Sequence, residues 1–175
     1  MVLTTSGGLH RYRLHDRVRV TGFEHECPLL RFIGKENNVS DHFGEKVTER
    51  HVREALDAIG LDVAFALVAC EGSAYTLFIE TSADADQLLA AAEQLETALD
   101  ENVHYRYCRH LGQLGPLRVF RVSHDGRSTW LRESARRGQR LGEIKPLVLS
   151  RHDGWARVFS GGYVHAKEMA ATHLI

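Results

Sequence analysis

The chain has 175 residues, of which 43% are hydrophobic, and this suits one domain of ordinary size with a short appendage. Its 22 basic residues nearly cancel its 23 acidic residues, so the net charge gives no electrostatic basis for a nucleic-acid partner or a membrane surface. The three cysteines, Cys27, Cys70 and Cys108, contain no C-x-x-C pair, which argues against a disulfide framework and a structural zinc site. The sequence shows neither a membrane-length apolar run nor a signal-peptide pattern. We therefore expect a cytoplasmic protein without a metal site.

Residues 9 to 34 alternate apolar and polar side chains in the manner of β-strands, with turn residues at His15-Asp16, Gly22 and Pro28. Such a small meander cannot bury both of its faces. We therefore expect it to pack on a partner domain or on the rest of the chain. The polar run at 34–41, GKENNVSD, separates the meander from the C-terminal remainder of the chain and is the predicted hinge.

After this predicted hinge, the apolar and polar residues follow a pattern that predicts alternating helices and strands. A helix is predicted to begin at Thr48-Glu49 and to end at Gly60. The further predicted elements are a hairpin of strands 63–70 and 74–80, helices at 83–99 and 105–110, a strand at 117–122, a helix at 128–137 and an apolar run at 144–149. This order implies an α+β sandwich with helices on one face of a mostly antiparallel sheet. The tail after Arg151 carries a turn signal at Gly161-Gly162 and indicates no function.

Three polar side chains are candidates for chemistry. Asp16 is predicted to lie in a turn, where a carboxylate can accept hydrogen bonds from two hydroxyls of a ligand, although spacing alone favours an ordinary Asx-turn. Asn37 can absorb a large backbone rotation, as most loop residues can. Lys145 precedes a proline and is predicted to be extended and exposed. It is either an ordinary surface lysine or a flexible charge that neutralises anionic oxygens during a reaction.

Several motifs succeed one another in a specific order. Tyr-Arg-x-x-Asp occupies residues 12–16, Val-Thr-Gly-Phe comes next, and Leu-Arg-Phe-Ile-Gly-Lys occupies residues 30–35. Asn-x-x-Tyr-x-x-x-Arg-x-x-Gly-Gln-Leu occupies residues 102–114. Together these motifs resemble the auxin-responsive acyl-acid amido synthetase family, which belongs to the firefly-luciferase-like, adenylate-forming superfamily. The resemblance covers about residues 2–149 and only the C-terminal portion of the family pattern.

The resemblance implies roles for four residues. Asp16 would bind the ribose hydroxyls of ATP and of the acyl-adenylate, although His15 stands where relatives usually have glycine. Lys35 would lie near the nucleotide, and Asn37 would be the hinge residue. Lys145 would be the lysine that enters the active site for adenylation, although its Glu-Ile-Lys-Pro-Leu setting lacks the family's arginine.

The resemblance also implies an architecture and a reaction. Residues 1–36 would be the last strands of an N-terminal adenylating domain, residues 37–150 a C-terminal lid domain and residues 151–175 an extension. The intact ligase would use ATP and Mg²⁺ to activate a carboxylic acid and would then join it to an amine or an amino acid. Without the N-terminal adenylating domain as its partner, the chain is expected to bind no cofactor and to be inactive. The alternative is a stand-alone, non-catalytic α+β binding or regulatory module derived from that lid.

Overall fold

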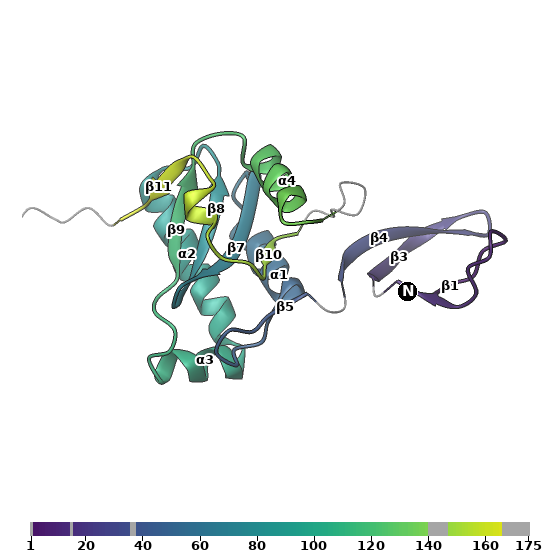
Figure 1. Cartoon of the computed structure of the whole chain (residues 1–175), viewed down its shortest axis with the longest axis horizontal. Helices are drawn as coiled ribbons and strands as arrows, with labels where there is room; N and C mark the ends of the chain where they lie inside the picture. The colour runs from purple at the N-terminus through teal and green to yellow at the C-terminus, as the bar shows by residue number, and fades with distance from the viewer. Residues whose placement is uncertain (1, 15, 36–37, 140–146, 166–175) are drawn as a thin grey trace, which may run out of the picture.

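A computed structural model describes residues 2–14, 16–35, 38–139 and 147–165. Figure 1 shows β-hairpins standing beside a larger sandwich of helices and strands. This arrangement confirms the α+β class and the small β-unit that precedes the sandwich.

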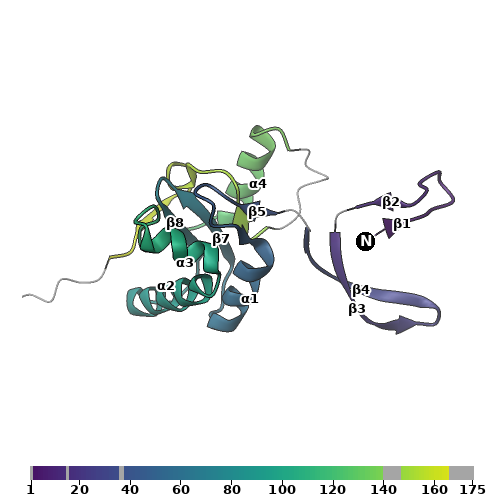
Figure 2. The same cartoon turned by 90° about the horizontal axis from the view of Figure 1, so that it is seen from below.

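The N-terminal unit contains two separate antiparallel strand pairs. Strand β1 (Val2–Leu3) pairs with β2 (Tyr12–Arg13), and β3 (Asp16–Glu24) pairs with β4 (Cys27–Lys35). Figure 2 shows from below that this unit lies to one side of the sandwich, which it approaches where β4 contacts α1.

The turn between β3 and β4 does not lie where the sequence predicts it. Gly22 and Pro28 both lie inside strands, and the chain reverses at residues 25–26, where His25 has a positive φ of 55°. Gly22 instead adjoins a shift in register between Val20 and Gly22, which is a common place for glycine in a strand. Pro28 is tolerated because β4 pairs with a single strand, so one edge of β4 needs no N–H donor.

The sandwich begins with a short ladder and continues through helices and strands in alternation. Its elements are β5 (Val39–Ser40), β6 (Val47–Thr48), α1 (Glu49–Ile59), β7 (Phe65–Glu71), β8 (Ala74–Glu80), α2 (Ala85–Asp100), α3 (Val103–His110), β9 (Arg118–Val122), α4 (Gly126–Arg136), β10 (Leu149–Ser150), a 3₁₀ helix (Trp155–Arg157) and β11 (Gly161–Tyr163). The expected hairpin and the expected helices are all present, with ends that differ from expectation by a few residues.

Helix ends depend on local hydrogen bonding. The Thr48 hydroxyl accepts a hydrogen bond from the His51 N–H at 3.3 Å, and Gly60 ends α1 in the left-handed region with φ 71°. Asp84 caps α2 and exchanges side-chain hydrogen bonds with Gln87, a complete capping box.

The central sheet has five strands in the order β10-β7-β8-β9-β11. Strand β10 is parallel to β7 and β8 is parallel to β9, whereas the β7–β8 and β9–β11 pairs are antiparallel. Over all described strand pairs of the chain, five are antiparallel and two are parallel.

The tail contributes an edge strand to this sheet. The Gly161-Gly162 pair lies in β11 rather than in a turn, opposite Val122 and Arg121. A Cβ at Gly161 would lie 1.9 Å from the Arg121 carbonyl oxygen, so the close approach of the two backbones requires glycine there.

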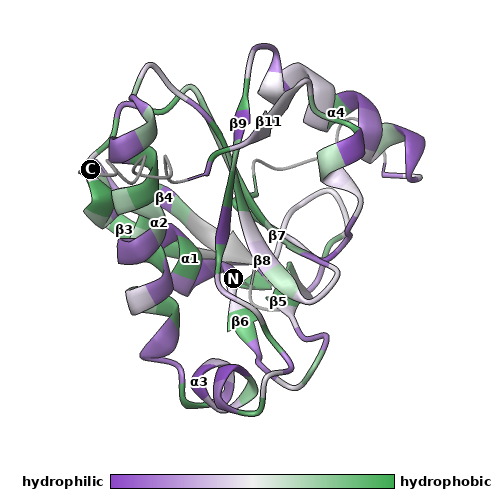
Figure 3. Cartoon of the chain, turned by 90° about the vertical axis from the view of Figure 1, so that its left-hand side faces the viewer, coloured by the Kyte–Doolittle hydropathy of each residue, from purple (hydrophilic) through white to green (hydrophobic). Residues whose placement is uncertain are grey.

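Helices cover both faces of the sheet, and the expectation of helices on one face is wrong. Helices α1 and α2 pack on one face, around Val68 and Leu77, while α4 and the 3₁₀ helix pack on the other, around Leu67 and Phe78. Successive β7 residues point to opposite faces, and both Leu67 and Val68 are fully buried. Figure 3 shows the apolar strands between helices that are apolar on one side and polar on the other.

Candidate functional site

Asp16 and Lys35, the two predicted nucleotide-binding residues, lie directly opposite each other in the β3–β4 register. Asp16 is the first residue of β3, not a turn residue as its sequence context predicts, and its side chain is 5% exposed. Residues opposite each other in an antiparallel pair have Cβ atoms about 5 Å apart. The hairpin therefore brings these two sequence-distant residues together.

The other two predicted site residues, Asn37 and Lys145, lie outside the described residues. The described residue beside the first of them, Asn38, is firmly attached to the sandwich. Its side-chain amide donates hydrogen bonds to the Leu149 carbonyl oxygen at 3.0 Å and to the Glu49 carboxylate at 2.5 Å. Its own carbonyl oxygen accepts from the Glu49 N–H at 3.0 Å. The sandwich is therefore anchored from Asn38 onward.

The Glu49 carboxylate is the centre of this anchor. It is 1% exposed and also accepts a hydrogen bond from Arg53 at 2.7 Å, one turn further along α1. Burial of a carboxylate is tolerated when charged and polar donors surround it. Its place in the first turn of α1 is also favourable for the helix dipole. Asn38 thus ties the start of α1 to β10.

A second buried carboxylate, that of Glu45, organises the loop at residues 41–46. It is fully buried and accepts hydrogen bonds from the backbone N–H groups of His42 at 2.9 Å and of Phe43 at 2.7 Å. The backbone can fold around it because Gly44 has φ 97° and Lys46 has φ 48°, both in the left-handed region. The Glu45 side chain therefore holds the loop together through hydrogen bonds to the loop backbone.

Tyr75 joins this loop to the sheet. Its hydroxyl donates to the Glu45 carboxylate at 2.6 Å and lies 2.7 Å from the Ser40 hydroxyl. A phenol has one hydrogen, so Ser40 is the donor in the second bond. Burial raises the pKa of the Tyr75 hydroxyl, and the adjacent Glu45 carboxylate raises it further. Tyr75 therefore stays neutral and serves as a fixed hydrogen-bond donor.

The motif at residues 102–114 has a packing role. The Asn102 side chain caps α3 through the His104 N–H at 3.0 Å and donates to the Glu45 carbonyl oxygen at 3.0 Å. Arg109 bridges the Glu96 carboxylate at 2.8 Å and the Leu114 carbonyl oxygen at 2.7 Å. These contacts join α2, α3 and the loop at 41–46 into one unit.

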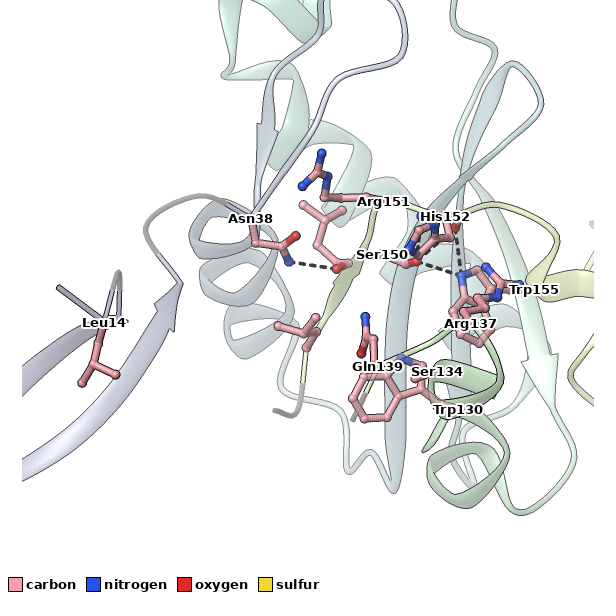
Figure 4. A pocket seen from close by; sticks show the side chains of 12 residues that line it. Leu14, Asn38, Trp130, Ser134, Arg137, Gln139, Ser150, Arg151, His152 and Trp155 are labelled. Atoms are coloured by element: carbon pink, nitrogen blue, oxygen red, sulfur yellow. Dashed lines mark hydrogen bonds between the residues drawn. The ribbon is translucent and has the colours of Figure 1, made fainter. Parts of the chain in front are cut away.

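A cavity of about 660 Å³ lies between α4, β10 and the tail, close to Asn38. We call it the α4 pocket; six of its lining residues are Trp130, Arg137, Leu149, Arg151, His152 and Trp155. Asn38 lies at its edge, and Leu14 of the N-terminal unit lies further away (Figure 4). The pocket thus adjoins the junction of the two parts of the molecule.

Trp155 forms a rigid wall of the α4 pocket. Its indole N–H donates to the Ser150 hydroxyl at 2.8 Å and to the His152 carbonyl oxygen at 2.9 Å. The Arg137 guanidinium lies 4.4 Å from the centroid of the Trp155 ring, and Phe159 stacks on the ring at 5.5 Å. The ring is therefore fixed and almost fully buried.

The charge of Arg137 is oriented by Glu133 on the preceding turn of α4. Glu133 accepts hydrogen bonds from Arg136 and Arg137, both at 2.8 Å, and these bonds lower the pKa of Glu133 to about 2. Arg137 also donates to the Asp153 carbonyl oxygen at 3.1 Å. Helix α4 therefore presents a fixed cation at the pocket.

Sequence reasoning did not find Asn38, Glu45 or the α4 pocket. A buried Glu45 has no sequence signal, because its apolar surroundings come from distant elements. The tail does carry one signal, a tryptophan after the polar run SRHDG, which is uncommon in a segment without structure. Within the described ranges, no three His, Cys, Asp or Glu side chains come together as a metal site. A helix long and apolar enough to cross a bilayer is likewise not found there.

The fold and this site define the chain as a mixed α+β domain joined through a short polar link to a β-hairpin unit. Comparison with known families gives the particular family. Residues 46–153 match the GH3 family C-terminal domain, and residues 1–35 match the GH3 family central domain. The chain therefore belongs to the GH3 family.

Sequence comparison with individual proteins also points to the GH3 family. The indole-3-acetic acid-amido synthetase GH3.8 of Oryza sativa subsp. indica is 30% identical over 139 residues, which cover 68% of this chain and 23% of that protein. The probable indole-3-acetic acid-amido synthetase GH3.6 of Oryza sativa subsp. japonica is 41% identical over 61 residues, which cover 35% of this chain and 12% of that protein. The chain thus spans less than a quarter of the length of these relatives.

Solved structures show the same fold. The GH3.15 acyl acid amido synthetase superposes with a TM-score of 0.65 and 20% identity, over 90% of this chain and 32% of that one. A structure of the AtGH3.15 acyl acid amido synthetase in complex with 2,4-DB gives a TM-score of 0.67, over 94% of this chain and 33% of that one.

Proposed function

We propose that the chain is the C-terminal lid of an ATP-dependent, acyl-adenylate-forming ligase that joins a carboxylic acid to an amine or an amino acid. The observation that carries the proposal is the β3–β4 register, which sets Asp16 opposite Lys35 immediately before the hinge, in a chain of the GH3 family. The names of the relatives, indole-3-acetic acid-amido synthetases, support this reaction class.

In this proposal, the buried Asp16 carboxylate accepts hydrogen bonds from the ribose hydroxyls of ATP and of the acyl-adenylate. Lys35 supplies a positive charge near the nucleotide. Lys145 neutralises the negative charge that develops on the carboxylate and α-phosphate oxygens during adenylation, which is the task of a flexible point charge. The lid then rotates and the amine attacks the adenylate.

The proposed hinge is Asn37. The hydrogen bonds of Asn38 to Leu149 and Glu49 support this position, because they attach the chain to the sandwich directly after it. We propose residues 1–36 as the last strands of the N-terminal adenylating domain, 37–150 as the lid and 151–175 as an extension. A rotation between two half-reactions presents different groups to one site in turn.

The partner that we propose for the hairpin is the adenylating domain. Val20 and Leu30 lie opposite each other in the β3–β4 ladder and are 51% and 48% exposed, and Phe23 is 67% exposed. Apolar side chains gathered in this way favour an interface. The acyl pocket would belong to that domain, so we propose that the chain alone has no ligase activity.

ATP is the proposed nucleotide, and Mg²⁺ would accompany its phosphates. The buried Asp16 carboxylate, opposite a lysine, suits ribose hydroxyls and a nearby phosphate. The described residues do not gather the acidic ligands that Mg²⁺ needs, so we propose that its ligands come from ATP and the partner domain. The cysteines Cys27, Cys70 and Cys108 are free thiols, which favours a reducing compartment such as the cytoplasm.

ATP–pyrophosphate exchange with a panel of carboxylic acids tests this function. The comparison is between the chain alone and the chain joined to the polypeptide encoded immediately upstream of it. We expect exchange only in the joined form, and loss of that exchange on Lys145→Ala. Lys46→Ala is the matched control, because Lys46 is an exposed lysine in a weak surface ion pair with Asp41. Exchange in neither form would contradict the ligase function and leave a binding module.

A further inference from the structure

The described lining of the α4 pocket carries cationic side chains that the proposed ligase roles do not use. Arg137, Arg151 and His152 line it, and no Asp or Glu side chain is among its lining residues in the described part of the chain. Arg151 and His152 are exposed, and neither forms an ion pair with a described residue. Among the described lining residues an ammonium group would find no carboxylate, whereas an anion would meet the two guanidinium groups of Arg137 and Arg151.

The rest of the pocket is apolar and well fixed. Trp130 is 5% exposed and Leu149 is fully buried, and they form its floor beside the Trp155 wall. Its volume of about 660 Å³ lies within the range of small-molecule sites. Because Arg137 and Phe159 pack on the ring of Trp155, which is 1% exposed, a planar ring of a ligand has no open indole face to stack on.

We propose that the α4 pocket binds a small organic anion with an apolar body, with its negative group held by the guanidinium groups that line the pocket, Arg137 and Arg151, and its body against Trp130 and Leu147. The anionic group is a carboxylate or a phosphate, which share the ability to accept hydrogen bonds from a guanidinium. Asn38 lies at the edge of the pocket and is hydrogen bonded to Leu149. A bound anion would therefore contact the anchor that comes directly after the hinge.

The site can be tested on this chain by itself, because both of its two tryptophans line the pocket. Tryptophan fluorescence is titrated with phenylacetate, with phenyl phosphate and with the neutral analogue phenylacetamide. We expect saturable quenching by at least one anion, at least about tenfold tighter than by the amide, since hydrogen bonds to charged groups contribute about 1.5–3 kcal/mol. The two anions distinguish a carboxylate ligand from a phosphate ligand.

Two variants and one matched control assign the binding to the pocket. Arg137→Ala and Arg151→Glu should each weaken the anion by about tenfold or more. Arg136→Ala should leave binding unchanged, because Arg136 pairs with the same Glu133 but is 79% exposed and does not line the pocket. Circular dichroism confirms that each variant is folded.

Three results would overturn the proposal: no saturable binding, equal binding of the amide and the anions, or variants that bind as the parent chain does. AMP is titrated as a further arm. If AMP binds more tightly and displaces the anion, the pocket belongs to the nucleotide site and the separate anion site is wrong. ATP–pyrophosphate exchange is measured independently, so failure of this site and failure of the ligase function are distinguishable.

Discussion

Two buried carboxylates, those of Glu45 and Glu49, hold the region from Asn38 to α1 in place. Each is almost fully buried. Glu45 accepts hydrogen bonds from Phe43 of its own loop and from Tyr75 of β8, and Glu49 accepts them from Arg53 of its own helix and from Asn38. The sequence marks neither as buried, because Tyr75 and Asn38 become their neighbours only through the tertiary fold. This is why the contacts that anchor the chain from Asn38 onward could not be predicted from the sequence, whereas its polarity suggested the hinge that we propose.

Tyr75→Phe should destabilise the chain by about 1–3 kcal/mol, because it leaves the buried Glu45 carboxylate without one donor and the Ser40 hydroxyl without its acceptor. Urea unfolding at neutral pH measures this. Tyr107→Phe is the control, since Tyr107 is 63% exposed and should change stability little. Equal effects of the two changes would contradict the role of Tyr75.

The three thiols should differ sharply in reactivity. Cys27 is exposed, whereas Cys70 and Cys108 are each 2% exposed. Burial raises the pKa of the Cys70 thiol to about 12 and also raises the pKa of Cys108, so neither forms the reactive thiolate. Ellman's reagent should label Cys27 rapidly in the folded chain and the other two only after unfolding. Rapid labelling of Cys70 would show that this face of the sheet opens.

At the scale of elements, α4 depends on the charge of Glu133. Its pKa is lowered from 4.5 to about 2 by hydrogen bonds from Arg136 and Arg137. A lowered pKa in the folded state means that the stabilisation is complete above about pH 4.5 and is lost as the pH falls toward 2. The difference in unfolding free energy between the parent chain and Glu133→Gln should therefore be present at pH 7 and shrink near pH 2.5.

Glu54→Gln is the matched control for this prediction. Glu54 also forms an i,i+4 pair, with Arg50, but at 3.5 Å and with both side chains more than half exposed. Such a pair contributes little, so this variant should behave as the parent chain does at both pH values. A Glu133→Gln difference that is the same at pH 7 and at pH 2.5 would mean that the charge of Glu133 does not stabilise α4.

The elements differ in how well the sequence predicted them. Helices α1 and α2 were predictable because a cap residue and an apolar stripe coincide in each, at Thr48 and at Asp84. The ends of β3 and β4 could not be predicted, because Gly22 and Pro28 usually mark turns but are tolerated in an irregular, two-stranded hairpin. The role of the tail was also hidden, since β11 is defined by its pairing with β9.

At the scale of the whole molecule, the family and the α+β class were predictable from the order of the motifs. The second layer of helices, which covers the other face of the sheet, could not be predicted from the sequence. The continuous apolar run of β7 is compatible with burial on both faces, but only the packing of Trp130 and Trp155 shows what covers the second face. The hairpin with Asp16 and Lys35 and the sandwich with Asn38 then meet at a link of two residues, 36 and 37.

The central claim is that this link is the pivot of a lid, and Asn37→Pro tests it most directly in the joined form. Proline fixes φ and restricts the preceding residue, so a pivot there would be locked. We expect one half-reaction, adenylation or amide formation, to fall by about 100-fold, because a misplacement of about 1 Å can cost that much. The other half-reaction and the Asn37→Ala control should keep nearly full rates. If Asn37→Pro leaves both half-reactions unchanged, the chain does not act as a lid that rotates at Asn37.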